Sequence, residues 1–143
     1  MKYFSYALTV NEFTMMDICP DAVRFGPCTL HGHELRFAES ADIIHNIQST
    51  VDGILWEIPE EYIDMITAIE HHDDKQQVLV SFGKQTLRAW VSKRKMHIPP
   101  EVPSWEYWEE LEDAYDQQGL PIMQIVKAID SIEYYIDTGI KND

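Results

Sequence analysis

VDGILWEIPEEYIDMITAIEHHDD, residues 51–74, is the stretch of sequence that decides the fold. Its first third is mostly apolar and partly β-branched, which is typical of a strand packed in a sheet. Pro59 follows where a proline favours the first helical turn, and Glu60 and Glu61 place negative charge at the positive end of the helix dipole. The pattern therefore predicts a strand that passes through Pro59 into a helix ending near Glu70.

Glu70 is the candidate general acid/base of the chain. The spacing i, i+3, i+4 and i+7 predicts one core-facing stripe on the helix, made of Tyr62, Met65, Ile66 and Ile69. Four residues after Ile66, Glu70 falls on the border of this stripe, in the last turn. Apolar neighbours and the negative end of the helix dipole both disfavour a charged carboxylate and raise its pKa, which suits acid/base catalysis. The alternative is that Glu70 is one of 25 acidic residues without a special role.

The composition indicates one strongly acidic globular domain, residues 1–143. The length suffices for one core and is too short for two. Its net charge of −14 repels nucleic acid phosphates and anionic membrane surfaces, so we expect neither as a partner. The same charge is compatible with a cationic protein partner or with mimicry of a polyanion. The one basic cluster, residues 93–95, is interpreted as a solvated strand end, not a binding patch.

The cysteines and histidines predict neither a disulfide framework nor a metal site. Cys19 and Cys28 have no partner motif, and we expect two small buried thiols of a cytoplasmic protein. No run approaches the roughly 20 apolar residues that span a bilayer. Strand alternation predicts His31 and His33 on one face, and residues 71–74 form a second group, but neither spacing matches a zinc motif. We therefore expect exposed or loop histidines, with no metal and no other cofactor.

The remaining segments predict an α+β fold, with about five strands in a curled mixed sheet and helices packed on it. Strands are expected over residues 2–8, over residues 28–37 with a bulge near Gly32, and in a hairpin of residues 77–82 and 86–92 that turns at Gly83. Residues 38–50 are predicted to be a loop with a short extended piece at 42–44. Helices are expected over residues 11–18, over 105–117 between a Ser104 cap and Gly119, and after Pro121.

Short motifs with a characteristic order extend over nearly the whole chain: YFSYALT (residues 3–9), CP (19–20), LHGHELRF (30–37), VDGILWEI (51–58), Glu70 after a helix, and GLP (119–121). In this order and spacing they resemble the gamma-glutamylcyclotransferase-like family, which has the AIG2-like fold. The resemblance implies a small mixed β-barrel-like sheet of about five to six strands with flanking helices.

The resemblance also implies an enzyme that cyclises the γ-glutamyl group of a small amine or peptide. The substrate's own α-amine attacks the γ-carbonyl, releases an amine or amino acid, and leaves 5-oxoproline. Glu70 would act first as general base and then as general acid, while backbone amides of the N-terminal loop cradle the glutamyl carboxylate. The substrate-binding residues expected with it are Tyr6, Ala7, Leu8 and Thr9 in the loop, with Trp56 or Tyr107 beside the pocket.

The sequence departs from the family pattern at this loop. Ala7 stands where the family has glycine, and an alanine lacks the easy access of glycine to positive φ. Leu8 stands where the family has serine. His71 follows Glu70 at a position where glycine is common. Two further hypotheses therefore stay open. One is a non-catalytic module on the same fold that binds a small molecule or a protein; the other is a protein whose acidic surface binds a partner, for example through Glu109, Glu110, Glu112 and Asp113.

Overall fold

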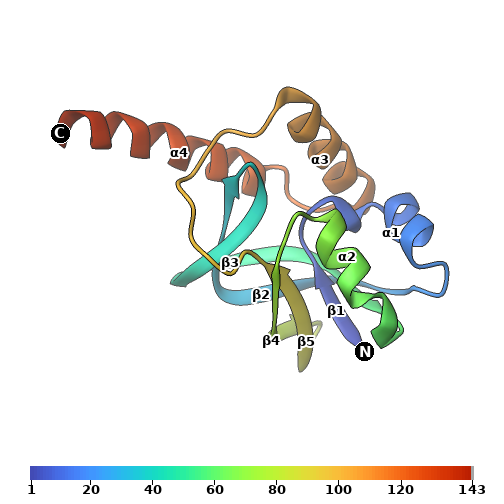
Figure 1. Cartoon of the computed structure of the whole chain (residues 1–143). Helices are drawn as coiled ribbons and strands as arrows, with labels where there is room; N and C mark the ends of the chain where they lie inside the picture. The colour runs from blue at the N-terminus through green and yellow to red at the C-terminus, as the bar shows by residue number, and fades with distance from the viewer. Residues whose placement is uncertain (143) are drawn as a thin grey trace.

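Five strands close into a barrel in this computed structural model, which describes residues 1–142 and places the side chains of residues 1–132. They are β1 (Lys2–Ser5), β2 (Val23–Ala38), β3 (Ser40–Glu57), β4 (Asp74–Phe82) and β5 (Gln85–Lys93). Around the barrel their order is β1-β3-β2-β4-β5, with a parallel contact between β1 and β5 and antiparallel pairing elsewhere (Figure 1). The predicted α+β class and the small mixed barrel-like sheet are therefore confirmed.

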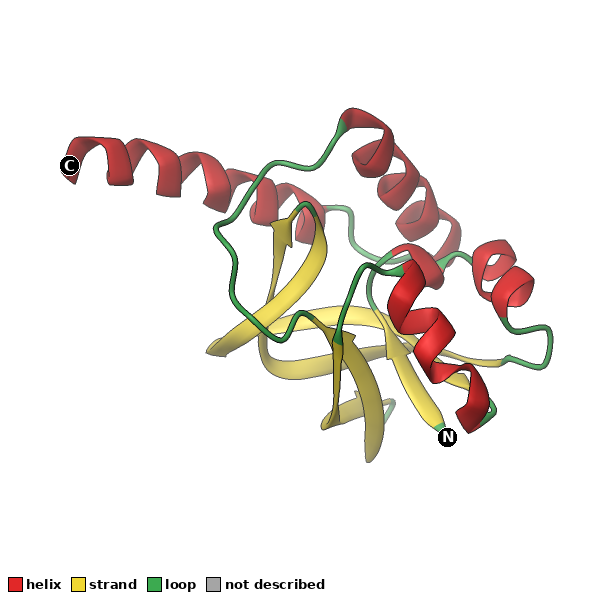
Figure 2. Ribbon diagram, in the orientation of Figure 1, coloured by secondary structure: helices red, strands yellow, loops and turns green. Residues whose placement is uncertain are grey.

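The helical segments connect the strands, and α1, α2 and α3 lie together beside one side of the barrel (Figure 2). In chain order the segments are η1 (Leu8–Val10), α1 (Glu12–Ile18), η2 (Glu60–Tyr62), α2 (Ile63–Ile69), α3 (Trp105–Gln118) and α4 (Met123–Asn142). The start of α4 packs against β2. None of these described helices combines the length and the apolar composition needed to cross a membrane.

Local capping signals in the sequence determine where three of the helix ends lie. The Asn11 side chain accepts a hydrogen bond from the Thr14 amide at 3.1 Å, and the Ser104 hydroxyl accepts one from the Tyr107 amide at 3.2 Å. These bonds satisfy amides that a first helical turn leaves unpaired. Gly119 ends α3 in the left-handed conformation, with φ of 70°. The predicted Ser104 cap and the predicted stop at Gly119 are therefore present.

The long hairpin of β2 and β3 replaces the loop predicted over residues 38–50. Its turn lies at Glu39, and the pairing runs from Ala38 opposite Ser40 to Val23 opposite Glu57. The prediction was wrong because polar residues in this segment indicate a solvated loop, whereas the segment pairs with β2 and tertiary packing buries two of them, Ser40 and Asp42. The predicted bulge is confirmed, since the register shifts at Gly32, whose φ is 73°.

Two further boundaries differ from the prediction. The first strand ends at Ser5, not at residue 8, because the next residues turn into η1. The helix after Pro59 begins as the short η2 and becomes α-helical only at Ile63. Its buried face consists of Ile63, Ile66 and Thr67, while Met65 and Ile69 of the predicted stripe are 54% and 45% exposed. The core-facing stripe is therefore rotated relative to the prediction.

Candidate active site

Glu70 lies on the buried face of α2 because of this rotation. It follows Ile63 by seven residues and Ile66 by four, so it shares their side of the helix. Its amide donates to the Ile66 carbonyl at 3.1 Å, and it is the C-cap residue of α2. The next residue, His71, has a φ of 59° and turns the chain toward β4. Only 2% of Glu70 is exposed.

The two carboxylate oxygens of Glu70 have different surroundings. Oε2 accepts hydrogen bonds from the Thr9 amide at 3.3 Å and from the Thr9 hydroxyl at 3.1 Å. The Ser5 hydroxyl lies 3.0 Å from the Thr9 hydroxyl and supports it. Oε1 is buried and has no hydrogen-bond partner among the described residues. One oxygen is therefore held in place by Thr9, and the other is buried without a partner among the described residues.

Burial raises the pKa of the Glu70 carboxyl to about 7. Hydrogen bonds from Thr9 and from the Leu8 amide act in the opposite direction, because they favour the ionised form, and the negative charge of Glu110 adds to the increase. Burial is the largest of these effects. At neutral pH the carboxyl can therefore serve as a base in one step and as an acid in the next.

Neutral tyrosines surround the carboxyl. Burial raises the pKa of Tyr3, Tyr107 and Tyr115, and the charge of Glu70 contributes to each increase. The Tyr115 hydroxyl donates to the Tyr6 carbonyl at 2.6 Å, next to the loop that holds Glu70. These phenols stay protonated at neutral pH and supply polar but uncharged surroundings.

The structure brings only some of the predicted binding residues to Glu70. Thr9 contacts it directly, while Ala7 is fully buried and Leu8 is half-buried in the same loop. The Tyr6 hydroxyl points elsewhere and donates to the Ser92 carbonyl at 2.7 Å.

Trp56 and Tyr107 lie in different settings. Trp56 is fully buried opposite Tyr3, and its indole nitrogen has no hydrogen-bond partner among the described residues. Tyr107 lies nearer: its hydroxyl accepts a hydrogen bond from the Ala41 amide at 2.9 Å, on the β3 segment beside Glu70. Of the two residues expected beside the pocket, Tyr107 is therefore the one near the carboxyl.

His72 is the main residue that the sequence prediction missed. The sequence predicts an exposed or loop histidine, yet His72 is only 6% exposed. Its Nε2 donates to the Ala41 carbonyl at 2.7 Å, so its Nδ1 accepts from the Ser92 hydroxyl at the same distance. Burial lowers its pKa and keeps the ring neutral. No local pattern in the sequence indicated that His72 is buried and hydrogen-bonded, because its partners Ala41 and Ser92 lie on β3 and β5.

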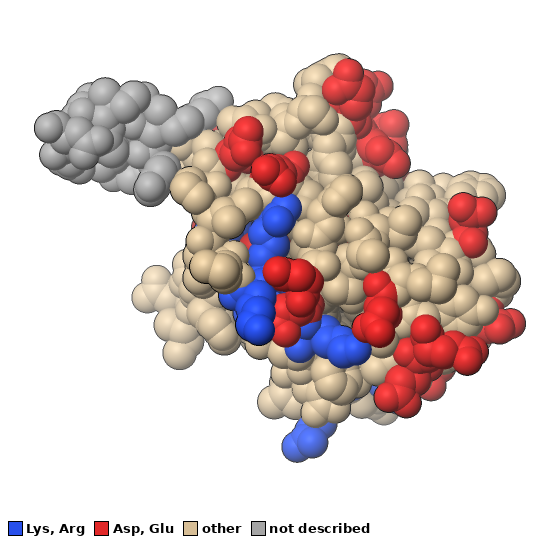
Figure 3. Space-filling model, viewed as in Figure 1, with Lys and Arg blue, Asp and Glu red and all other residues tan. Residues whose placement is uncertain are grey.

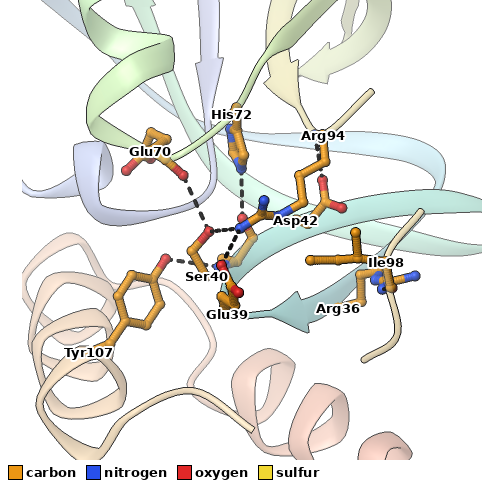
Figure 4. A network of polar contacts seen from close by, with 10 residues as sticks. Arg36, Glu39, Ser40, Asp42, Glu70, His72, Arg94, Ile98 and Tyr107 are labelled. Atoms are coloured by element: carbon orange, nitrogen blue, oxygen red, sulfur yellow. Dashed lines mark hydrogen bonds and ion pairs between the residues drawn. The ribbon is translucent and has the colours of Figure 1, made fainter. Parts of the chain in front are cut away.

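Ser40, at the start of β3, joins Glu70 to Arg94. Its hydroxyl donates to the Glu70 carbonyl at 3.3 Å and accepts from Arg94 Nη2 at 3.3 Å. Figure 4 shows Glu70, His72, Arg94 and Tyr107 approaching this segment from different sides. The Arg94 side chain is only 17% exposed, so its interpretation as part of a solvated strand end was wrong. The cause is tertiary: the end of β5 packs against the tip of the β2–β3 hairpin.

A cavity of about 330 Å³ opens beside these residues. Its walls include Ser40, His71, Arg94 and Tyr107. The Ser40 hydroxyl donates to the Glu70 carbonyl and His71 follows Glu70 in the sequence, so the cavity lies beside the main chain of Glu70. Glu70 itself is not among the lining residues.

The other histidines and the cysteines form no comparable site in the described part of the chain. His31 is exposed and bonds the Ser81 hydroxyl at 2.8 Å, whereas His33 is buried with its ring 4.6 Å from that of His45. Cys19 and Cys28 are buried free thiols, as predicted. Among the residues that the structure describes, no three metal-binding side chains gather in one place.

Comparison with known proteins identifies the fold. No protein-family model and no curated protein sequence matches the chain. Among solved structures, one described as gamma-glutamyl cyclotransferase is 16% identical, with a TM-score of 0.74 over 90% of this chain and 85% of the other. An uncharacterized protein from Homo sapiens, 17% identical, has the same TM-score over 89% of this chain and 85% of its own. YkqA from Bacillus subtilis, also 17% identical with a TM-score of 0.74, is matched over 93% of this chain but only 54% of its own. The chain therefore has the gamma-glutamylcyclotransferase-like fold.

Proposed function

We propose that this protein cyclises the γ-glutamyl group of a small amine or peptide to 5-oxoproline, with Glu70 as general acid/base. The observation that supports this proposal is the environment of the Glu70 carboxyl. It is buried, it has a pKa of about 7, and one of its oxygens is held by Thr9 while the other has no partner among the described residues. A carboxyl in this state is suited to moving a proton in both directions at neutral pH.

The proposed reaction uses Glu70 twice. Its carboxylate takes a proton from the substrate's α-amine as the amine nitrogen bonds to the γ-carbonyl carbon. The resulting tetrahedral intermediate then collapses, the bond to the leaving nitrogen breaks, and Glu70 returns the proton to that nitrogen. The products are 5-oxoproline and a free amine or amino acid. Thr9 keeps Oε2 in place throughout, so that Oε1 is the oxygen that exchanges the proton.

A non-catalytic module that binds a small molecule or a protein is the second candidate. Two observations favour it. Only 2% of Glu70 is exposed, and the neighbouring cavity is lined by residues other than Glu70. In addition, Ala7 and Leu8 stand where the resemblance would place glycine and serine. In this second candidate the pocket holds a ligand without converting it, in a cytoplasmic protein with reduced thiols.

Release of 5-oxoproline from γ-glutamyl amino acids and γ-glutamyl amines separates the two candidates. We expect the parent protein to release it and Glu70→Gln to release none, with the melting temperature nearly unchanged because glutamine keeps the size of the side chain. Glu109→Gln, an exposed position on α3, is the matched control and should retain full activity.

If the parent protein releases no 5-oxoproline from a broad panel of γ-glutamyl compounds, the proposed enzymatic activity is contradicted. In that case, a γ-glutamyl compound that raises the melting temperature without being converted would support the binding module, because a ligand that binds only the native state stabilises it.

A further inference from the structure

A backbone amide of the loop expected to hold the substrate carboxylate contacts Glu70 instead. The Thr9 amide donates to Oε2 at 3.3 Å. A backbone amide carries one hydrogen, so this donor is engaged by the protein's own carboxylate. If the substrate is a γ-glutamyl compound, its α-carboxylate needs another partner.

Arg94 is the one arginine or lysine among the described residues that line the cavity beside Glu70. Its side chain is 17% exposed, and its Nε is buried without a hydrogen-bond partner among the described residues. A guanidinium has five donors in a planar fork that matches a carboxylate. Among the described residues, the Arg94 guanidinium donates one hydrogen bond, from Nη2 to the Ser40 hydroxyl. The cavity therefore contains a cation with free capacity for an anion.

Three hydrogen bonds connect Arg94 with the start of β3 and with Glu70. The Arg94 amide donates to Asp42 Oδ1 at 3.0 Å, which anchors the backbone at the end of β5. Its Nη2 donates to the Ser40 hydroxyl, which in turn donates to the Glu70 carbonyl, so two hydrogen bonds join the guanidinium to the main chain of Glu70 (Figure 4). In a glutamyl group the α-amine and the α-carboxylate are bonded to one carbon. An amine near Glu70 therefore places the carboxylate close by.

The acidic residues around the cavity do not prevent this binding. Glu39 lies 3.7 Å from Arg94 Nη2, but its side chain is 69% exposed. Exposed ion pairs contribute little, so a substrate carboxylate can displace Glu39 from Arg94 at small cost. Glu101 also lines the cavity, but it is exposed, so water screens its charge from a bound carboxylate.

We propose that Arg94, supported by Ser40, binds the α-carboxylate of the γ-glutamyl group in this cavity, in place of the N-terminal loop. The inference rests on the proposed function for the identity of the substrate. It assigns the carboxylate to a side chain that comes from the end of β5, whereas Glu70 and Thr9 perform the acid/base step.

Two substrates that differ only in the carboxylate provide the test. They are γ-glutamyl ethylamide and 4-aminobutanoyl ethylamide, which share the amine, the carbonyl and the leaving group. Arg94→Gln should raise KM for the first by about 10- to 100-fold, as expected for a lost hydrogen bond to a charged group, with a smaller change in kcat. It should not change kcat/KM for the second, and Arg94→Lys should recover part of the loss. Lys95→Gln, an equal charge change at an exposed neighbour, should alter neither substrate.

An equal loss on both substrates would overturn the role of Arg94 while leaving the cyclotransferase proposal intact. If the parent converts neither compound, the proposed activity is contradicted. The role of Arg94 in holding the carboxylate is then tested by ligand binding. The melting temperature of Glu70→Gln should then rise with γ-glutamyl ethylamide, and that of Glu70→Gln/Arg94→Gln should not. A rise in both variants, or in neither, would overturn the assignment.

Discussion

The carboxyl group of Glu70 is subject to two opposing effects. Burial removes it from water and favours the neutral form, whereas Thr9 donates two hydrogen bonds that favour the ionised form. Burial is the larger effect, and the pKa of the carboxyl rises to about 7. Without Thr9 the pKa would be higher still, and less of the carboxylate would be available as a base at neutral pH. The balance between the two effects sets the chemistry that this residue can perform.

The raised pKa of Glu70 predicts that the free energy of unfolding depends on pH. The Glu70→Gln variant should lack this part of the pH dependence. The native pKa is raised from 4.5 to about 7, so between these values the native state binds more protons than the unfolded chain. The contribution to stability is therefore complete below about pH 4.5 and is lost as the pH rises through about 7. Between about pH 5 and pH 8, the free energy of unfolding of the parent should fall by about 2 to 3 kcal/mol relative to Glu70→Gln.

Urea unfolding of both proteins at several pH values measures this difference. Glu109→Gln again serves as the control, because it removes an exposed carboxylate from α3 and should follow the parent. The prediction fails if the parent and Glu70→Gln lose stability in parallel as the pH increases.

Among the structural elements, β1 is positioned by a close approach to β3. Ser5 pairs with Ile54, and Gly53 lies beside them without a side chain. A Cβ on Gly53 would overlap the Ser5 carbonyl oxygen and the Phe4 ring, which lies 2.7 Å from that position. Glycine therefore allows β1 to lie against β3 at Ser5, the residue whose hydroxyl contacts Thr9, which in turn holds Glu70.

Gly53→Ala should consequently destabilise the protein more than an alanine at a turn glycine. Gly83 is the matched comparison, since it has a φ of 59° but no atom within 4 Å of the position that a Cβ would occupy. We expect a loss of about 1 kcal/mol for Gly83→Ala, from backbone strain, and a loss of about 3 kcal/mol or more for Gly53→Ala, from overlap with backbone. Denaturant unfolding gives both values, and equal losses would contradict the proposed close approach.

At the scale of the whole molecule, α3 and α4 connect the barrel to the N-terminal loop. Gln124 accepts from the Asp52 amide at 2.7 Å and donates to the Asp52 carbonyl at 3.0 Å. It also donates to the Tyr115 hydroxyl at 3.0 Å, which donates in turn to the Tyr6 carbonyl. Residues far apart in the sequence therefore act together to position the loop that contains Thr9.

The distribution of charge is the second property of the whole molecule. On the face shown in Figure 3, acidic side chains lie in several separate groups, whereas most of the basic side chains lie in one central strip and a further basic group lies apart at the lower edge. Exposed Glu106, Glu109, Glu110 and Asp113 follow one another along α3, at spacings where like charges repel. With a net charge of −14, this repulsion opposes folding, and a cationic protein partner would relieve it.

Salt should therefore stabilise the parent protein. Screening at about 0.5 M NaCl shortens the range of repulsion to a few ångströms, so the melting temperature should rise above its value at about 0.02 M. The combined variant Glu109→Gln/Glu110→Gln/Asp113→Asn should show a smaller rise, because it carries less repulsion along α3. Calorimetry at both salt concentrations measures the two shifts, and a parent that melts earlier in high salt would refute the idea.

Much of the element order follows from local patterns in the sequence. Ser104 and Gly119 bound α3, and Asn11 caps α1, because each of these signals acts through its own backbone and that of its neighbours. The short motifs along the chain also led to the correct fold. Their order in the sequence reflects the order of the strands and helices that carry them. Glu70 was found at the end of a helix for the same local reason.

The surroundings of Glu70 were decided only by the tertiary structure. Its burial depends on the rotation of α2, which is set by how Ile63 and Ile66 pack, and its hydrogen bonds come from Thr9, 61 residues away. His72 and Arg94 were misjudged because their partners lie on β3 and β5. By itself, the sequence determined the order of the elements, their caps and the candidate carboxylate. The pKa of that carboxylate and the groups around it arise from long-range packing, which leaves no periodic pattern in the sequence.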